Sequence, residues 1–155
     1  MDDPKAVAIT GHRHLSDKDK ATIWRSMQTL VCNPTISEIL FGGAVGADTE
    51  ALQAALLHRK GKSPRLTVVV PCREEDQPWA ARKWFGQADK VIELGNPITS
   101  ADRYESYHIR NRYLVDHAIS VVAFWDGLPK SGTGSCVRYA KDKGVKLIHI
   151  PMGQK

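Results

Sequence analysis

The sequence predicts a Rossmann-like α/β domain, a three-layer sandwich in which helices cover both faces of a mostly parallel sheet. Two observations lead to this prediction. Short apolar runs alternate along the chain with segments whose apolar residues recur at helical spacing. The runs are continuous, which is typical of strands buried on both faces of a parallel sheet. A length of 155 residues fits one such domain, over residues 1–155.

Six continuous apolar runs account for the strands. Each has the length of a buried strand, and the third is stopped by Pro71, which lacks the N–H that a sheet ladder needs. The predicted strands are Ala6–Thr10, Glu38–Phe41, Leu66–Val70, Lys90–Leu94, Ile119–Trp125 and Lys146–Ile150.

Five segments between these runs have the spacing of helices. In the first, Ile23, Met27 and Leu30 share one side. Pro78 stands at the start of the third, where its missing N–H costs nothing. Gly144 ends the fifth, as glycine often does beyond the last helical turn. The predicted helices are Lys20–Val31, Thr49–Lys60, Pro78–Ala88, Tyr104–Ala118 and Ser135–Gly144.

The formal net charge is +5, with the basic residues spread along the chain. This balance favours a phosphorylated or polyanionic partner without choosing between a nucleotide and a nucleic acid. No apolar run approaches the ~20 residues of a membrane span, and the N-terminal MDDPK lacks the apolar segment of a signal peptide. We therefore expect a cytoplasmic protein with no membrane partner.

The cysteines and histidines indicate neither a disulfide framework nor a metal site. Cys32, Cys72 and Cys136 are widely spaced and odd in number, which favours free thiols in a reducing compartment. The histidines lack the spacing of metal ligands, so no metal is expected.

Four loops follow predicted strands at the sheet edge where parallel α/β folds bind ligands. They supply Arg13, Arg73 and Lys130, so we expect the crevice between them to be basic. The loops are Thr10–His14, Gly42–Glu50, Pro71–Asp76 and Asp126–Ser135.

Two of these loops, GGAVGA (Gly42–Ala47) and SGTGS (Ser131–Ser135), have the composition of phosphate-binding turns. Glycines let the backbone approach a ligand closely, and the N–H groups at a helix start favour an anion. Neither loop is a G-x-G-x-x-G fingerprint or a Walker loop. Each is a weak signal alone, but together with GHR at residues 11–13 they predict a phosphate or nucleotide site.

Structural interpretations remain open for several of the polar residues. Asp48 can be a helix N-cap, with Glu50 complementing the helix dipole. Asp126 can form an Asx turn, and His12 can be an ordinary loop residue. Arg110 can lie on a solvated helix face.

The C-terminal stretch IRNRYLVDHAISVVAFWDGLPKSGTGSCVRYAKDKGVKLIHI resembles the YpsA-like branch of the SLOG superfamily. That branch carries an R-N-x-x-(M/L)-V-D-H helix, a strand ending in a Y/W-D-G turn, and a G-G-T or S-G-T loop before a helix. TGHR, GGAVGAD and PCREEDQPW fit the same pattern, and the first two also fit the relative DprA. The resemblance covers nearly the whole chain.

The resemblance implies a Rossmann-like fold that binds nucleotides or nucleotide-derived ligands. A relative, LOG, is a phosphoribohydrolase that releases the base from cytokinin nucleoside monophosphates. Its helix arginine is matched by Arg110, but Val137 and Arg138 stand where LOG has catalytic glutamates. Because cleavage through an oxocarbenium-like state needs a carboxylate near the sugar, we do not expect the LOG route.

We therefore expect this chain to bind a nucleotide or an ADP-ribose-like ligand through the glycine-rich loops, in the manner of a sensor. Arg13 and Arg110 would supply charge-assisted contacts, and Asn111 and Asp126 would read the ribose or base. The predicted ligand-binding residues are Gly11, His12, Arg13, Gly42, Gly43, Gly46, Asp48, Arg110, Asn111, Asp126, Gly127, Ser131, Gly132, Thr133, Gly134 and Ser135.

Two alternatives stay open. The first is an N-glycosidase or phosphoribohydrolase-like enzyme acting on nucleotides, with Asp48, Glu50 or Asp126 as its carboxylate. The second is single-stranded nucleic-acid binding, in which tryptophans would stack on bases along a basic groove. The resemblance is also compatible with a homo-oligomer that pairs through helices. The tryptophans available for stacking are Trp79, Trp84 and Trp125.

Overall fold

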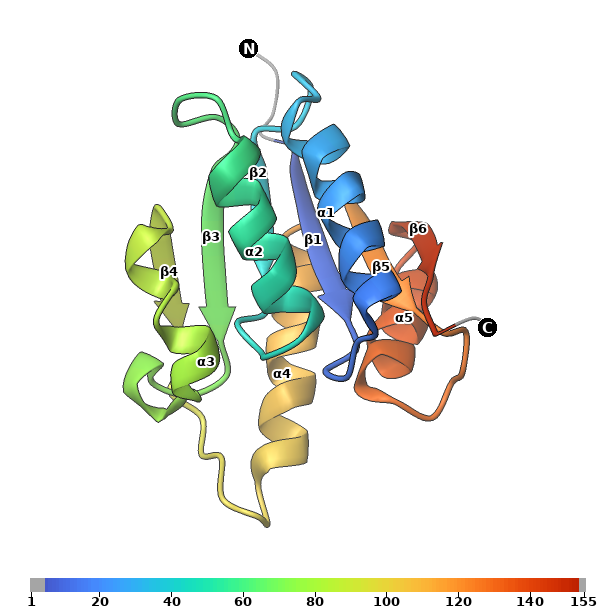
Figure 1. Cartoon of the computed structure of the whole chain (residues 1–155). Helices are drawn as coiled ribbons and strands as arrows, with labels where there is room; N and C mark the ends of the chain where they lie inside the picture. Colours follow the sequence, from blue (N-terminus) through green and yellow to red (C-terminus); the bar gives the residue numbers. More distant parts are fainter. Residues whose placement is uncertain (1–4, 154–155) are drawn as a thin grey trace.

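The computed structural model describes residues 5–153 and contains one six-stranded sheet in which every pair of neighbouring strands is parallel (Figure 1). The strand order is β4-β3-β2-β1-β5-β6, which confirms the predicted Rossmann-like α/β class. The N-terminal residues 1–4, most of the MDDPK segment, lie outside this description. The strands are β1 (Ala6–Gly11), β2 (Glu38–Phe41), β3 (Arg65–Val70), β4 (Lys90–Glu93), β5 (Ser120–Trp125) and β6 (Lys146–Pro151).

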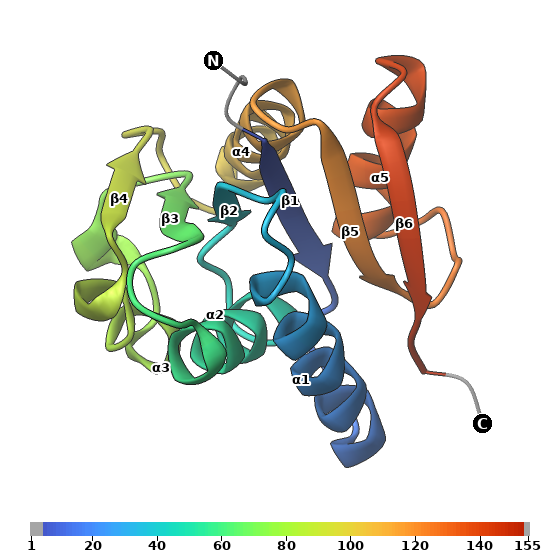
Figure 2. The same cartoon turned by 90° about the horizontal axis from the view of Figure 1, so that it is seen from above.

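Helices cover both faces of the sheet (Figure 2). α1, α2 and α3 lie on one face, and α4 and α5 lie on the other. Between residues 5 and 153, none of the helices has the length and apolar character needed to cross a bilayer. The helices are α1 (Asp17–Val31), α2 (Ala47–His58), α3 (Trp79–Arg82), α4 (Arg103–Asp116) and α5 (Gly132–Asp142).

The predicted helix Pro78–Ala88 is wrong as a continuous element. It is divided into the single turn of α3 and a separate 3₁₀ turn, η2 (Phe85–Gln87). Only Ala81 and Phe85 are buried in this stretch, so it has no apolar stripe that would hold a long helix against the sheet. Gly86 further lowers its helix propensity.

α1 starts three residues earlier than predicted because of a capping box. The Ser16 hydroxyl accepts from the Asp19 N–H, and the Asp19 carboxylate accepts from the Ser16 N–H, both at 3.1 Å. Each bond satisfies an amide that the start of a helix leaves without a partner. The helix therefore begins at Asp17, before the apolar spacing is visible in the sequence.

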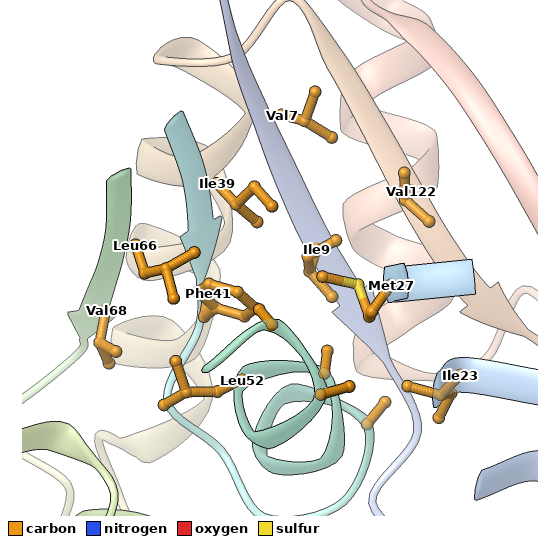
Figure 3. Close-up of a cluster of buried hydrophobic side chains, with 14 of the residues drawn as sticks. Val7, Ile9, Ile23, Met27, Ile39, Phe41, Leu52, Leu66, Val68 and Val122 are labelled. Atoms are coloured by element: carbon orange, nitrogen blue, oxygen red, sulfur yellow. The ribbon is translucent and has the colours of Figure 1, made fainter. Parts of the chain in front are cut away.

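The larger core lies between the sheet and the α1 and α2 helices (Figure 3). Phe41 and Ile9 point from β2 and β1 toward Leu52 of α2 and Met27 of α1, and all four side chains are almost fully buried. A second cluster on the opposite face joins α4 and α5 to the sheet through residues such as Leu114. The central strands β1, β2, β3 and β5 are thus buried on both faces, whereas the edge strands β4 and β6 stay largely exposed.

The direction in which strands are added reverses between β1 and β5. From β1 the chain adds β2, β3 and β4 outward on one side, and α4 then returns across the other face to β5, which pairs with β1. Such a reversal leaves a crevice beyond the carboxyl ends of the two central strands. The N-terminal half of α4 and the first turn of α5 border this end of the sheet.

Two leucines of α2 test this packing. Leu52 is 2% exposed and Leu57 is 69% exposed. Leu52→Ala should lower the free energy of unfolding by roughly 2–5 kcal/mol, because it leaves a cavity in the core. Leu57→Ala, the matched control, should change it by less than about 0.5 kcal/mol. Chemical denaturation of both variants measures the difference, and equal losses would contradict the packing described here.

Candidate ligand crevice at the topological switch point

A crevice opens where β1 and β5 lie side by side, and it has two connected parts. The inner part, called here the deep compartment, has a volume of about 230 Å³. The wider part, called the outer groove, has about 780 Å³ and shares Arg13, Tyr107 and Asn111 with it. The deep compartment is lined by Ile9, Thr10, Gly11, His12, Arg13, Ala44, Asp48, Tyr107, Arg110, Asn111, Leu114, Ser131, Gly132 and Thr133.

Glycines bring the loop after β1 against the start of α2. A Cβ on Gly11 would overlap the Cβ of Ala47. Gly46 has φ +93°, and a Cβ there would lie 2.5 Å from the backbone of His12 and Arg13. The Ala47 N–H donates to the His12 carbonyl at 2.9 Å. These contacts fix Arg13 at the mouth of the crevice, which a bulkier residue at position 11 or 46 would prevent.

A buried arginine and a buried aspartate both lie beside Gly42, at the end of β2. Arg110 of α4 is 7% exposed, its Nη1 donates to the Gly42 carbonyl, and its Nε donates to Asn111 Oδ1 at 3.0 Å. Asp48 of α2 is also 7% exposed, and its Oδ2 accepts from the Ala44 N–H at 3.3 Å. Asp48 Oδ1 is buried with no hydrogen-bond partner among residues 5–153. The solvated-face interpretation of Arg110 is therefore wrong.

Burial controls the protonation of this pair. It raises the pKa of Asp48 to about 6, against the lowering effect of the Arg110 charge and the Ala44 hydrogen bond. Burial also lowers the pKa of Arg110, while the Asp48 charge opposes that change. Asp48, which lines the deep compartment, is therefore mostly ionised at neutral pH.

The SGTGS segment is the first turn of α5, so the prediction that its helix begins only at Ser135 is wrong. Ser131 is the N-cap, and its hydroxyl accepts from the Gly134 N–H at 2.9 Å. The Ser135 N–H donates to the Ser131 carbonyl. Within residues 5–153 the amides of Gly132 and Thr133 have no such partner, and both residues line the deep compartment. The positive end of the α5 dipole therefore opens into the crevice.

Asp126 forms an Asx turn, which is one of the interpretations that the sequence left open. Its Oδ1 accepts from the Leu128 N–H at 2.9 Å. Its own N–H donates to His12 Nε2 at 3.0 Å, which joins the ends of β5 and β1. His12 is therefore more than an ordinary loop residue, since it both lines the compartment and bridges the two central strands.

The structure brings ten of the predicted ligand-binding residues to the crevice. Ser135 lines the outer groove, and the others line the deep compartment. They come from four separate parts of the chain, as expected for the carboxyl edge of a parallel sheet. The ten are Gly11, His12, Arg13, Asp48, Arg110, Asn111, Ser131, Gly132, Thr133 and Ser135.

The other predicted residues do not line the crevice. Gly42 lies behind Asp48 and Arg110, and Gly43 faces Val68, Val70 and Phe85 in the core. Gly46 and Glu50 line a separate hollow of about 500 Å³ beside α1. The residues outside the crevice lining are Gly42, Gly43, Gly46, Glu50, Asp126, Gly127 and Gly134.

The expectation that the loop after β3 faces the crevice is wrong. Arg73 is exposed and pairs with Glu75 at 3.0 Å and with Asp76 at 3.4 Å. Two strands, β2 and β1, separate β3 from the switch point between β1 and β5, so the loop that follows β3 is directed to another part of the edge.

Sequence reasoning missed the aromatic residue at the mouth of the crevice. Tyr107 lies between two arginines, with its ring centroid 5.3 Å from Arg13 Cζ and 5.8 Å from Arg110 Cζ. Its position three residues before Arg110 on one helix could have revealed it, because such residues share a face. Arg103, Tyr104 and Arg138 of the outer groove were missed as well.

The predicted tryptophans lie elsewhere. Trp84 lines the hollow beside α1, and Trp79 is exposed on α3. Trp125 donates its indole N–H to the Leu128 carbonyl at 2.9 Å. Across residues 5–153, no three histidine, cysteine, aspartate or glutamate side chains gather in a way that could hold a metal ion.

An all-parallel sheet covered on both faces, with a crevice at its switch point, defines a Rossmann-like domain. Comparison with known families narrows this class: the chain belongs to the DNA recombination-mediator protein A family, which it matches over residues 1–155. It is also 27% identical, over 145 residues, to the uncharacterised SPbeta prophage-derived protein YoqJ of Bacillus subtilis (strain 168). That match covers 82% of this chain and 80% of YoqJ.

Solved structures share the fold at lower identity. DNA processing protein A from Helicobacter pylori, described for its single-stranded DNA binding mode, has a TM-score of 0.75 and 24% identity. The match covers 98% of this chain but only 66% of that one. A molybdenum cofactor binding protein from Rippkaea orientalis has a TM-score of 0.68 and 19% identity, over 95% of this chain and 76% of its own.

Two glycines of α5 differ sharply in the space around them. A Cβ on Gly134 would lie 2.5 Å from the Pro129 carbonyl oxygen, whereas a Cβ on Gly132 would meet nothing within 4 Å. Gly134→Ala should therefore lower the free energy of unfolding by roughly 1–3 kcal/mol, and Gly132→Ala should leave it nearly unchanged. Thermal unfolding of the two variants measures the contrast. An unchanged free energy of unfolding in Gly134→Ala would contradict this expectation and show that the backbone of residues 128–129 can move to make room for the added methyl group.

The raised pKa of Asp48 predicts a stability difference that depends on pH. Between the unfolded value near 3.8 and the folded value of about 6, the folded state binds more protons, so stability falls as pH rises. Relative to Asp48→Asn, the wild type should lose roughly 2–3 kcal/mol of unfolding free energy across this window. Denaturation of both proteins from pH 4 to 7 tests this, and other titrating groups cancel in the comparison. A constant difference would contradict the raised pKa.

Proposed function

We propose that this chain binds a nucleotide or nucleotide-derived ligand in the crevice, with a phosphate at the N-terminus of α5. The observation that carries the proposal is the first turn of α5: Gly132 and Thr133 line the deep compartment, and within residues 5–153 their N–H groups have no hydrogen-bond partner. Amides in this position bind an anion by hydrogen bonding and through the helix dipole. The same proposal includes a sensor role, in which the chain binds the ligand and does not convert it.

Arg13 supports this placement of the phosphate. It is exposed, lines both parts of the crevice and stacks on Tyr107, and no carboxylate of residues 5–153 pairs with it. A guanidinium held in this way can form a bidentate contact with a phosphate. Its position near the start of α5 places a positive side chain and a positive helix end around one small volume.

The two volumes of the crevice suit the two chemical parts of a nucleotide. Pockets that hold a whole small ligand usually measure ~300–1,000 Å³. The deep compartment, at about 230 Å³, is smaller than this range and the outer groove, at about 780 Å³, lies within it. A sugar phosphate would fill the deep compartment, and the base would extend past the Tyr107 ring into the outer groove.

Within the family we place the chain in the YpsA-like branch of the SLOG superfamily, on the motifs described above. The surroundings of Arg138 support the inference that this chain does not cleave a glycosidic bond in the way that LOG does. Arg138 lines the outer groove and donates to the Pro129 carbonyl at 3.3 Å. Of the three carboxylates considered for an N-glycosidase, Asp48 alone lines the crevice.

Arg13 offers a direct test. Arg13→Ala should weaken nucleotide binding ~10- to 100-fold, the usual effect of losing a charge-assisted hydrogen bond. Arg25→Ala makes the same charge change on an exposed site of α1 and should leave binding unchanged. Calorimetric titration with AMP, ADP, NAD and ADP-ribose gives the affinities. Equal binding by both variants would place the phosphate elsewhere.

A second function is favoured by the outer groove. Arg103, Lys130 and Arg138 line it beside the exposed Tyr104. Basic side chains that follow a backbone, with aromatic rings on which bases stack, are typical of single-stranded nucleic-acid binding. Membership of the DNA recombination-mediator protein A family supports this candidate as well.

Salt dependence separates this second candidate from the first. If the outer groove binds single-stranded DNA, oligonucleotide affinity should fall steeply between 50 and 200 mM salt, with the fall set by the number of phosphates contacted. Arg103→Ala should reduce the slope of log affinity against log salt by about 1. The control is Arg65→Ala, because Arg65 is exposed at the N-terminal end of β3, away from the carboxyl edge of the sheet. An unchanged slope in Arg103→Ala would remove the outer groove from DNA binding.

A further inference from the structure

We propose that Asp48 binds a sugar hydroxyl of the ligand, so that the deep compartment selects a 5′-phosphoribosyl group over its deoxyribose counterpart. This inference rests on the proposed function, because it assigns the second contact of the same ligand. It gives a ligand-binding role to a residue whose charge also balances that of the buried Arg110.

The inference starts from an oxygen atom without a partner. Asp48 lines the deep compartment and is 7% exposed, yet its Oδ1 accepts no hydrogen bond among the described residues. Buried polar atoms in native proteins are almost always hydrogen-bonded, because leaving one unpaired is costly. An unpaired acceptor on a residue that lines a cavity is suited to a hydrogen-bond donor of a bound ligand.

Within residues 5–153, no protein group donates a hydrogen bond to Oδ1. The Nη1 and Nε groups of Arg110 donate to the Gly42 carbonyl and to Asn111 Oδ1. The Ala44 N–H is directed to the other oxygen, Oδ2, at 3.3 Å. These bonds hold Arg110 and Ala44 in place and leave Oδ1 available.

The charge of Asp48 restricts what can approach it. A carboxylate at neutral pH repels a phosphate and accepts from an O–H or N–H group. The same compartment also contains groups of the reverse character, which are the Gly132 and Thr133 amides and Arg13. A ligand that fits both sets of groups carries an anion as well as hydroxyl donors.

A 5′-phosphoribosyl group has this arrangement. Its phosphate and its 2′- and 3′-hydroxyls lie at opposite ends of one sugar ring, and the group is small enough for a compartment of about 230 Å³. A deoxyribose lacks one of the donors, and an internal DNA phosphodiester has neither hydroxyl free. The compartment would thus distinguish a free ribonucleotide from a DNA chain.

The first test changes the ligand and leaves the protein intact. Wild-type protein is titrated with AMP, GMP, CMP and UMP, each against its 2′-deoxy and 3′-deoxy forms, and with ribose 5-phosphate against 2-deoxyribose 5-phosphate. A hydrogen bond to a charged group predicts that the ribose form binds ~10- to 100-fold more tightly than at least one deoxy form. Equal affinity throughout both series would overturn the inference.

The second test changes Asp48. Asp48→Ala should bind ribose and deoxyribose forms equally while keeping its affinity for inorganic phosphate. Glu50→Ala removes a carboxylate from the same helix outside the crevice and should keep the full preference. A preference that survives in Asp48→Ala would mean that another group reads the sugar. If Asp48→Ala does not fold, the ligand series on the wild type decides.

The two proposals fail in different ways. Binding of phosphate compounds that depends on Arg13 but ignores the sugar hydroxyls would overturn the role of Asp48 and leave the proposed function standing. Failure of all these compounds, inorganic phosphate included, to bind at millimolar concentration would overturn both.

Discussion

The buried guanidinium of Arg110 is the contact on which the crevice depends. α4 returns across one face of the sheet from the edge to the centre, and Arg110 joins this helix to the end of β2 through the Gly42 carbonyl. A charge that is removed from water is tolerated only when it is paired and hydrogen-bonded. Asp48 supplies the opposite charge from the other helical layer. One buried side chain therefore ties α4 to the carboxyl edge of the sheet beside the crevice.

The strands could be predicted from the sequence to within about one residue, and the reason is physical. A strand buried on both faces is mostly apolar, so β2 and β3 are visible as short runs dominated by apolar residues. The starts of α1 and α5 were harder to predict, because each depends on one hydroxyl, that of Ser16 or Ser131, accepting from an amide three residues on. Helical spacing alone does not mark such a start.

The candidate site could be predicted in position but only partly in residues. The carboxyl edge follows from the alternation of strands and helices, and most of the polar residues expected there do line the crevice. Glycines were the least reliable guide. Gly42 and Gly43 are adjacent, yet Gly42 lies beside Arg110 and Gly43 faces Val68 and Val70 in the core. A loop composition does not say which side of the sheet each glycine faces, and only the fold decides it.

The two outer strands of the sheet bear on association between copies of the chain. β4 has four residues with the exposed charges Lys90 and Glu93 at its ends, and β6 runs from exposed Lys146 to Pro151. Short edges with charges and a proline disfavour pairing of one sheet with another. These features protect the protein against edge-to-edge aggregation. Contacts between copies of the chain would then use helical or loop surfaces, and the sheet would not extend from one copy to the next.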